Sequence, residues 1–124
     1  VAAVEPQAPG GGFPASHAGV LAVADATTVI PALMAPGRDI PAPTPGGGYA
    51  FVSGTSFAAA EVSGLAALVR QLAPTAAMAN PAAWVTFPMS PPQSRAGMVD
   101  ACATLRKATA GIACASAQGT HNAW

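Results

Sequence analysis

The sequence has few charged residues, few cysteines and no hydrophobic run long enough to cross a membrane. Only 8% of its 124 residues are charged, well below the usual quarter, and the formal net charge is zero. Lys107 is the only lysine and the arginines are scattered, whereas nucleic-acid-binding proteins carry a basic patch or stripe. The longest apolar stretch, residues 57–69, is interrupted by Glu61 and is too short for a bilayer. We therefore expect neither a nucleic-acid partner nor a membrane span.

Cys102 and Cys114 are the two cysteines. Their short separation near the end of the chain favours a local disulfide, which implies an oxidising compartment and hence a secreted or periplasmic protein. Two buried free thiols are the alternative. Neither cysteine has a cluster of histidines or carboxylates beside it in the sequence, so we expect no metal site and no other cofactor.

The hydrophobic content of 52% is that of a globular chain, and the length suits one compact domain or a piece of a larger one. The low charge has two interpretations. Much of the surface is covered by a partner segment, or the chain is a secreted protein rich in Ala, Gly and Pro with a polar, uncharged surface.

Short apolar runs predict strands at residues 1–4, 20–23 and 28–34, the last interrupted by Pro31, and at 49–52. Stretches rich in Pro and Gly at 5–14 and 41–48 predict loops. Strands that lead into helices are typical of an α/β domain with a largely parallel sheet.

A long helix follows the last of these strands. Val62, Leu65, Val69 and Leu72 recur at spacings of three and four, which predicts a helix from residue 56 or 57 to Leu72, ended by Pro74. Shorter helices are expected near residues 82–85, after Asn80-Pro81, and over 99–108 with Leu105 facing inward.

The segment Gly54-Thr55-Ser56-Phe57-Ala58 places a serine where a strand leads into this helix. Free N–H groups and the helix dipole at such a position favour developing negative charge, which suits a nucleophile. The alternative is that Ser56 or Thr55 only caps the helix. The Gly-x-Ser-x-Gly elbow of α/β-hydrolases is not matched, because its last glycine is Ala58 here.

Residues 54–64 resemble the nucleophile helix of the subtilisin-like serine peptidases, which begins Gly-Thr-Ser-x-Ala-x-Pro and continues to Val-x-Gly. Three flanking segments resemble other motifs of that family in the same order: the aromatic-Pro-Ala-Ser of residues 13–16, the Ala-Pro-Gly turn of 34–40 and the Gly-x-Val-Asp-Ala of 97–101. The resemblance spans residues 1 to about 107.

The resemblance implies an α/β fold, part of a doubly wound parallel sheet with a central nucleophile helix. Residues 1–124 would be the C-terminal portion of a single peptidase domain, with Ser56 as nucleophile. The family uses an Asp-His-Ser triad in that order, so the Asp and His would come from an N-terminal segment of the same domain or from another protein chain. Peptides would be the substrates of the completed site.

The remaining candidates for a triad do not match the family's motifs. His17 and His121 are expected to face solvent, and the carboxylates that precede the nucleophile, Glu5, Asp25 and Asp39, match no aspartate motif of the family. We therefore expect the chain to be inactive by itself.

The sequence also departs from the family in three places. The family's Ala-Ala-x-Gly-Asn segment, whose Asn stabilises the oxyanion, becomes Ala2-Ala3-Val4-Glu5-Pro6, and loss of such a donor costs on the order of 100- to 1000-fold in turnover. The proline after the nucleophile is Ala60, followed by Glu61, and the stretch from residue 23 to 35 is short. Two interpretations follow: the nucleophile-bearing part of a serine endopeptidase, or a catalytically dead scaffold for binding or assembly.

Overall fold

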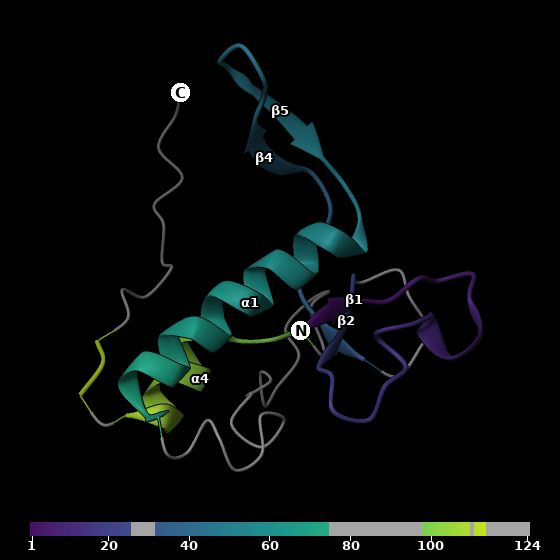
Figure 1. Cartoon of the computed structure of the whole chain (residues 1–124). Helices are drawn as coiled ribbons and strands as arrows, with labels where there is room; N and C mark the ends of the chain where they lie inside the picture. Colours follow the sequence, from purple (N-terminus) through teal and green to yellow (C-terminus); the bar gives the residue numbers. More distant parts are fainter. Residues whose placement is uncertain (26–31, 75–97, 110, 114–124) are drawn as a thin grey trace.

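Three short parallel strands and one long helix form the body of the structure (Figure 1). The computed structural model describes residues 1–25, 32–74, 98–109 and 111–113. The elements are β1 (Ala2–Ala3), the 3-10 helix η1 (Pro9–Gly11), β2 (Ala22–Ala24), β3 (Leu33–Met34), β4 (Ile40–Pro43), β5 (Tyr49–Val52), α1 (Thr55–Leu72) and α4 (Ala101–Ala108).

The sheet has the order β1-β2-β3, and both pairings are parallel. Helix α1 packs against β1 and β2, and its buried side chains form the main core with the strands. The members of this cluster are Val23, Ala35, Ala58, Ala59 and Val62. A parallel sheet covered by a helix confirms the predicted α/β class.

Residues on the opposite face of the sheet form a separate small cluster. Successive side chains of a strand point to opposite faces, so Ala24 faces away from α1 while Val23 faces it. Ala24 and Val4 pack there with Ala15, from the loop that joins β1 to β2. The sheet is therefore covered by a helix on one face and by a loop on the other.

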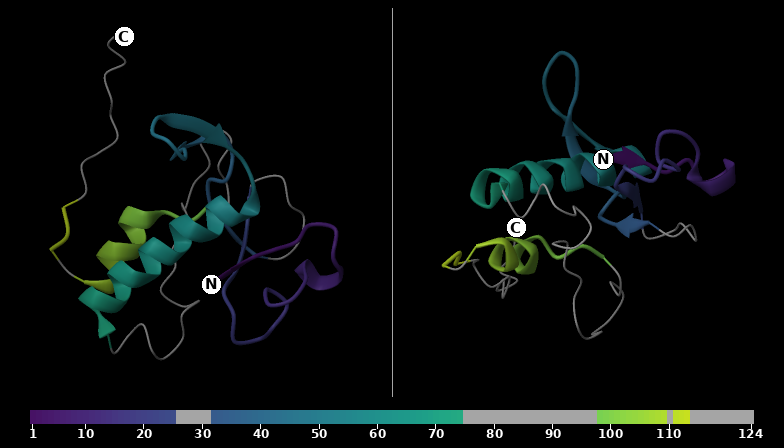
Figure 2. Two further views of the ribbon diagram at one scale, coloured as in Figure 1. Left: turned by 45° about the horizontal axis from the view of Figure 1, so that its top comes forward. Right: turned by 60° about the horizontal axis from the view of Figure 1, so that its bottom comes forward.

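Helix α1 spans Thr55–Leu72, which confirms the predicted helix to within two residues. Its C-terminal half packs against α4, as all three ribbon views agree (Figures 1 and 2). Leu65 and Val69 of α1 are buried there, with Leu105 of α4 packed against them. The inward orientation predicted for Leu105 is confirmed.

Helix α4 begins at Ala101 rather than at residue 99, because Asp100 adopts an extended conformation and caps the helix. The Ala103 N–H donates to the Asp100 Oδ1 at 2.8 Å. Replacing Asp100 with Ala leaves that N–H without its acceptor, so we expect a loss of about 1 kcal/mol in the free energy of unfolding. Urea titration followed by circular dichroism measures the loss, and Asp100→Asn, which keeps an acceptor, should recover most of it.

The loop predicted for residues 41–48 is wrong at its start. Residues Ile40–Pro43 form β4, which pairs antiparallel with β5 to make a hairpin. Pro41 and Pro43 argued for a loop because proline has no N–H for a ladder. They occupy alternate positions in β4, where the ladder to β5 does not require an N–H.

Several predictions concern residues outside the described ranges. These are the helix near 82–85, the strand segment at 28–30, the exposure of His121 and the state of Cys114. Cys102 lies in α4, and its disulfide with Cys114 stays a prediction. Among the described residues, no helix has the length and apolarity needed to cross a membrane. The same residues contain no cluster of three or more His, Cys, Asp or Glu suited to a metal ion.

Candidate active site

The start of α1 is bound to the carboxyl edge of the parallel sheet by two hydrogen bonds. The Thr55 hydroxyl donates to the Val4 carbonyl oxygen, just beyond β1, at 2.9 Å. The Gly54 N–H donates to the Gly37 carbonyl oxygen, in the turn after β3, at 2.7 Å. In open α/β sheets, ligands bind at this edge. Nothing in the sequence by itself had pointed to Thr55 as the residue that joins helix and sheet.

Two glycines allow this close approach. Gly54 has a φ of +152° and a ψ of 158°, a backbone conformation that is almost restricted to glycine. At Gly37 the limit is space, since a Cβ there would lie 2.9 Å from the Gly54 carbonyl oxygen and 3.2 Å from the Ala58 Cβ. It would also lie 3.0 Å from the Cβ of Asp25, at the carboxyl end of β2. The Ala-Pro-Gly turn therefore packs directly under the start of α1.

Ser56 is the second residue of α1 and is exposed. Within the described residues its hydroxyl forms no hydrogen bond. Ser63, two turns further along the helix, differs because its hydroxyl donates to the Ala59 carbonyl oxygen at 2.7 Å. The hydroxyl of Ser56 is thus available to a reactant or to a base from another segment.

The interpretation of Ser56 or Thr55 as a helix cap is wrong. The N-cap residue is Gly54, and no side chain caps this end. A capping side chain comes from the residue before the first helical position, whereas Thr55 and Ser56 both lie inside the helix. The Thr55 hydroxyl is committed to Val4 instead.

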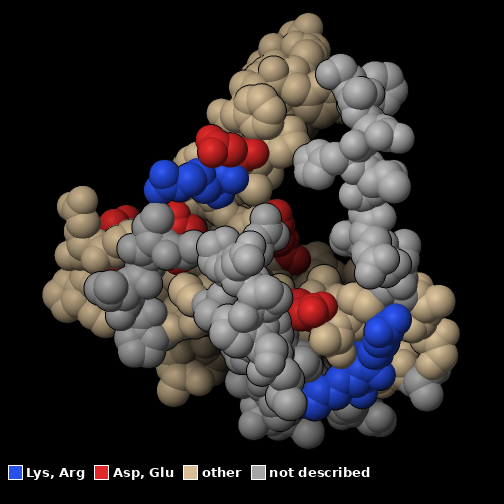
Figure 3. Space-filling model, turned by 180° about the vertical axis from the view of Figure 1, so that it is seen from behind, with Lys and Arg blue, Asp and Glu red and all other residues tan. Residues whose placement is uncertain are grey.

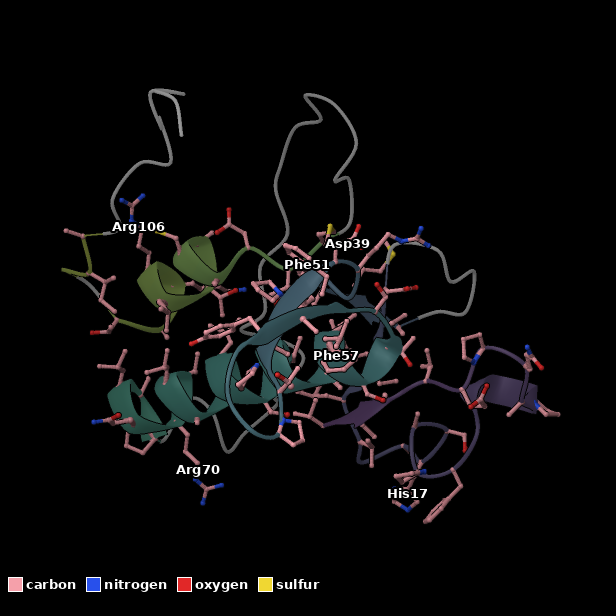
Figure 4. All side chains as sticks on the ribbon, turned by 90° about the horizontal axis from the view of Figure 1, so that it is seen from above. His17, Asp39, Phe51, Phe57, Arg70 and Arg106 are labelled. Carbon is pink, nitrogen blue, oxygen red and sulfur yellow. The ribbon has the colours of Figure 1, made fainter. Side chains whose placement is uncertain are left out.

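No described histidine accompanies Ser56. His17 is exposed, as predicted, and its Nδ1 accepts a hydrogen bond from the Gly19 N–H at 3.1 Å. Figure 4 shows His17 beyond β1, well apart from Phe57, the neighbour of Ser56. Asp39 lies at the base of the hairpin, where its N–H donates to the Ser53 hydroxyl at 3.0 Å. The described residues bring the exposed Ser56 hydroxyl to the sheet edge without a histidine beside it.

Glu5 occupies the position next to this edge where the family resemblance leads one to expect Gly-Asn. Its N–H donates to the Gly11 carbonyl oxygen at 2.8 Å, which closes a short loop over η1. Gly12 packs so tightly against it that a Cβ would lie 3.1 Å from the Glu5 Cβ. An exposed carboxylate therefore follows directly after Val4, the residue that binds Thr55.

The sequence model of the subtilase family matches residues 10–120, most of the chain. The chain belongs to the subtilase family. It is also 56% identical over 41 residues to an "Intracellular serine protease" from Paenibacillus polymyxa. That match covers 33% of this chain and 13% of the relative, so the chain spans a small part of the relative's length. No solved structure matches the chain.

The subtilase chain has a small pocket of about 60 Å³ between α1 and the segment that leads into α4. Its lining residues are Ala35, Pro36, Glu61, Val62, Leu65, Val99 and Ala101. Glu61 is the only charged one. Partial burial against these apolar neighbours raises the pKa of the Glu61 carboxyl above its usual value of 4.5.

The raised pKa of Glu61 makes stability depend on pH. Folding favours the neutral carboxyl, so the contribution of Glu61 is most favourable below pH 4.5 and is lost as the pH rises through the higher folded-state pKa. We expect Glu61→Gln to be more stable than wild type at neutral pH and to lose that advantage at acid pH. Urea unfolding of both proteins across this range checks the prediction; a difference that does not change with pH would contradict it.

Proposed function

We propose that this chain carries the nucleophile, Ser56, of a subtilisin-like serine endopeptidase and that it is inactive as an isolated chain. In this proposal residues 1–124 are the C-terminal portion of a single peptidase domain. The observation that carries it is the position of Ser56: an exposed hydroxyl without a described hydrogen bond, in the first turn of a helix bound to the carboxyl edge of a parallel sheet.

The chemistry follows from that position. The Ser56 oxygen attacks the carbonyl carbon of a peptide bond while a base takes its proton. The base gives that proton to the peptide nitrogen as the C–N bond breaks, so the amine leaves and an acyl-enzyme forms, which water then hydrolyses. N–H groups in the first turn of a helix lack partners within the helix, so they are available to donate hydrogen bonds to an oxyanion that forms beside the serine. The base and its orienting carboxylate come from an N-terminal segment of the same peptidase domain or from another protein chain.

The outer face of α1 supports docking of such a segment. An exposed helix carries charged residues on its outer side, whereas a helix that is apolar all round is buried. Six of the ten exposed positions of α1 carry small or apolar residues or a serine within the helix, Ala60, Ser63, Gly64, Ala67, Leu68 and Leu72, and only Glu61 and Arg70 among the ten are charged. Leu68 and Leu72 are 48% and 44% exposed. Covering this face would place α1 at the centre of a doubly wound sheet, as the family resemblance implies.

A catalytically dead scaffold for binding or assembly is the second candidate. The observation that favours it is Glu5, since a carboxylate beside the sheet edge opposes negative charge on an oxyanion where the family has Gly-Asn. The two candidates differ in one measurable property, the reactivity of Ser56 once the missing segment is supplied.

Two observations on the location of the protein point in opposite directions. The cysteine pair favours a secreted or periplasmic protein, whereas the relative from Paenibacillus polymyxa is named as an intracellular protease, which favours the opposite location. Alkylation of the native, unreduced chain followed by mass spectrometry distinguishes the two. Two modified thiols would overturn the disulfide and remove the support for an oxidising compartment.

The proposed function is tested with a fluorophosphonate probe, which forms an adduct only with an activated serine. The chain is labelled alone and together with the N-terminal portion of a subtilase domain, and the adduct is mapped by mass spectrometry. We expect an adduct on Ser56 only in the mixture. Folded, associated protein without an adduct would favour the scaffold.

A further inference from the structure

In the part of the chain that the structure describes, the β4–β5 hairpin leaves one strand edge unpaired. The Thr44 N–H donates to the Gly48 carbonyl oxygen at 3.1 Å, so these two residues form a hydrogen-bonded pair next to the turn. Hydrogen-bonded and non-hydrogen-bonded pairs alternate along an antiparallel ladder. The next hydrogen-bonded pair is therefore Ala42 with Ala50. The residues of β5 that alternate with these hydrogen-bonded positions direct their backbone N–H and C=O groups away from β4.

Those residues are Tyr49 and Phe51. Their opposite neighbours in β4 are Pro43 and Pro41, which have no N–H, so the outer edge of β4 lacks the donors that a further strand needs. The outer edge of β5 keeps both donors and acceptors. Among the described residues, no hydrogen bond outside the hairpin involves the backbone of Tyr49 or Phe51.

The side chains at this edge are aromatic and exposed. Tyr49 is 80% exposed and Phe51 is 76% exposed, and both lie on the same face of the hairpin. Residues 40–52 contain no charged residue, and the hairpin surface visible in Figure 3 likewise shows charged groups only near its base. Natural proteins commonly protect an exposed strand edge with Lys or another charge. This edge has no such protection.

We propose that the outer edge of β5 pairs with β5 of a second copy of this chain. With the strands antiparallel and a two-fold axis at Ala50, Tyr49 of each copy lies opposite Phe51 of the other. Each of these pairs is then hydrogen-bonded, which uses the outward N–H and C=O groups of both residues. An aromatic side chain faces an aromatic side chain at both positions.

A second copy fits this edge because the outer edge of β5 is complementary to an identical edge in antiparallel orientation. The two aromatics lie symmetrically about Ala50, and an uncharged strand does not repel an identical one. A two-fold contact of this kind closes on itself. The hairpin also stands out from the helices and from the parallel sheet in Figure 1 and in the right view of Figure 2, so the two bodies lie apart when the hairpins meet.

Paired charge variants test the proposal. One chain carries Tyr49→Lys with Phe51→Lys, the other Tyr49→Glu with Phe51→Glu. In light scattering coupled to size exclusion we expect concentration-dependent doubling of mass for wild type, monomers for each variant alone, and a dimer for their mixture, in which opposite charges face each other. Circular dichroism establishes that each variant keeps its α-helix content.

A matched control and a second measurement separate this edge from other surfaces. Leu68→Lys with Leu72→Lys changes exposed apolar residues of α1 and should leave the dimer intact. In hydrogen exchange, the amides of Tyr49 and Phe51 should slow as concentration rises, while that of Ala50 is protected throughout. A wild-type monomer, a dimer that both charge variants retain, or exchange at Tyr49 and Phe51 independent of concentration would each overturn the proposal.

Discussion

Ser56→Ala should abolish peptide hydrolysis by the completed domain, with a fall in turnover on the order of 10⁶-fold, the size of loss found when a subtilisin loses its nucleophile. The reason is that the other hydroxyl groups of α1 cannot replace that of Ser56. The Thr55 hydroxyl is bound to the Val4 carbonyl oxygen, and Ser63 lies two turns along the helix with its hydroxyl bound to Ala59. The measurement is kcat/KM for a peptide substrate with the N-terminal portion of the domain in excess.

Ser63→Ala is the matched control, since it removes a hydroxyl from an exposed position of the same helix. Its hydrogen bond lies within the helix, so we expect turnover within a fewfold of wild type. Comparable losses in both variants would mean that helix stability, not nucleophilic attack, accounts for the effect of Ser56. Undiminished turnover in Ser56→Ala would remove the serine from the mechanism altogether.

The main helix and the position of Ser56 could be predicted because both depend on local patterns. The spacing of Val62, Leu65 and Val69 is typical of a buried helix face, and all three are buried. A serine just after the last strand had to lie near the start of that helix. A periodic pattern of this length indicates which face of the helix is buried, whichever element packs against that face.

The hairpin and the Thr55 contact could not be predicted in the same way. Pro41 and Pro43 normally argue against a strand, and only the pairing with β5 shows that the ladder needs no N–H from them. The bond from Thr55 to Val4 joins residues 51 positions apart in the chain. Contacts at such separation depend on how the strands are ordered, which local propensity does not specify. The helix-cap interpretation failed because it relied on the residue types Ser and Thr, which commonly cap helices, whereas both residues lie inside the first turn and Gly54 is the N-cap.

Gly37→Ala should both destabilise the fold and displace the candidate nucleophile. The added methyl would lie 2.9 Å from the Gly54 carbonyl oxygen, and a backbone atom cannot rotate away as a flexible side chain can. Overpacking of this kind costs about 1–3 kcal/mol, which a lower midpoint in urea unfolding would reveal. The start of α1 must shift to make room, and Ser56 shifts with it.

Gly64→Ala separates the steric effect from a general response to adding a methyl group. Gly64 lies within α1, and a Cβ there meets nothing within 4 Å. Alanine is the better helix former by about 0.5–1 kcal/mol, so this variant should be more stable than wild type. Because Gly64 lies on the proposed docking face, labelling is compared with the N-terminal portion of the domain at saturating concentration, where Gly64→Ala should label as wild type does. Gly37→Ala should label more slowly even where it is fully folded, because a misplacement of about 1 Å can cost about 100-fold in rate. Equal labelling of both folded variants would mean that the Ala-Pro-Gly turn supports stability alone, and that the geometry around Ser56 does not depend on it.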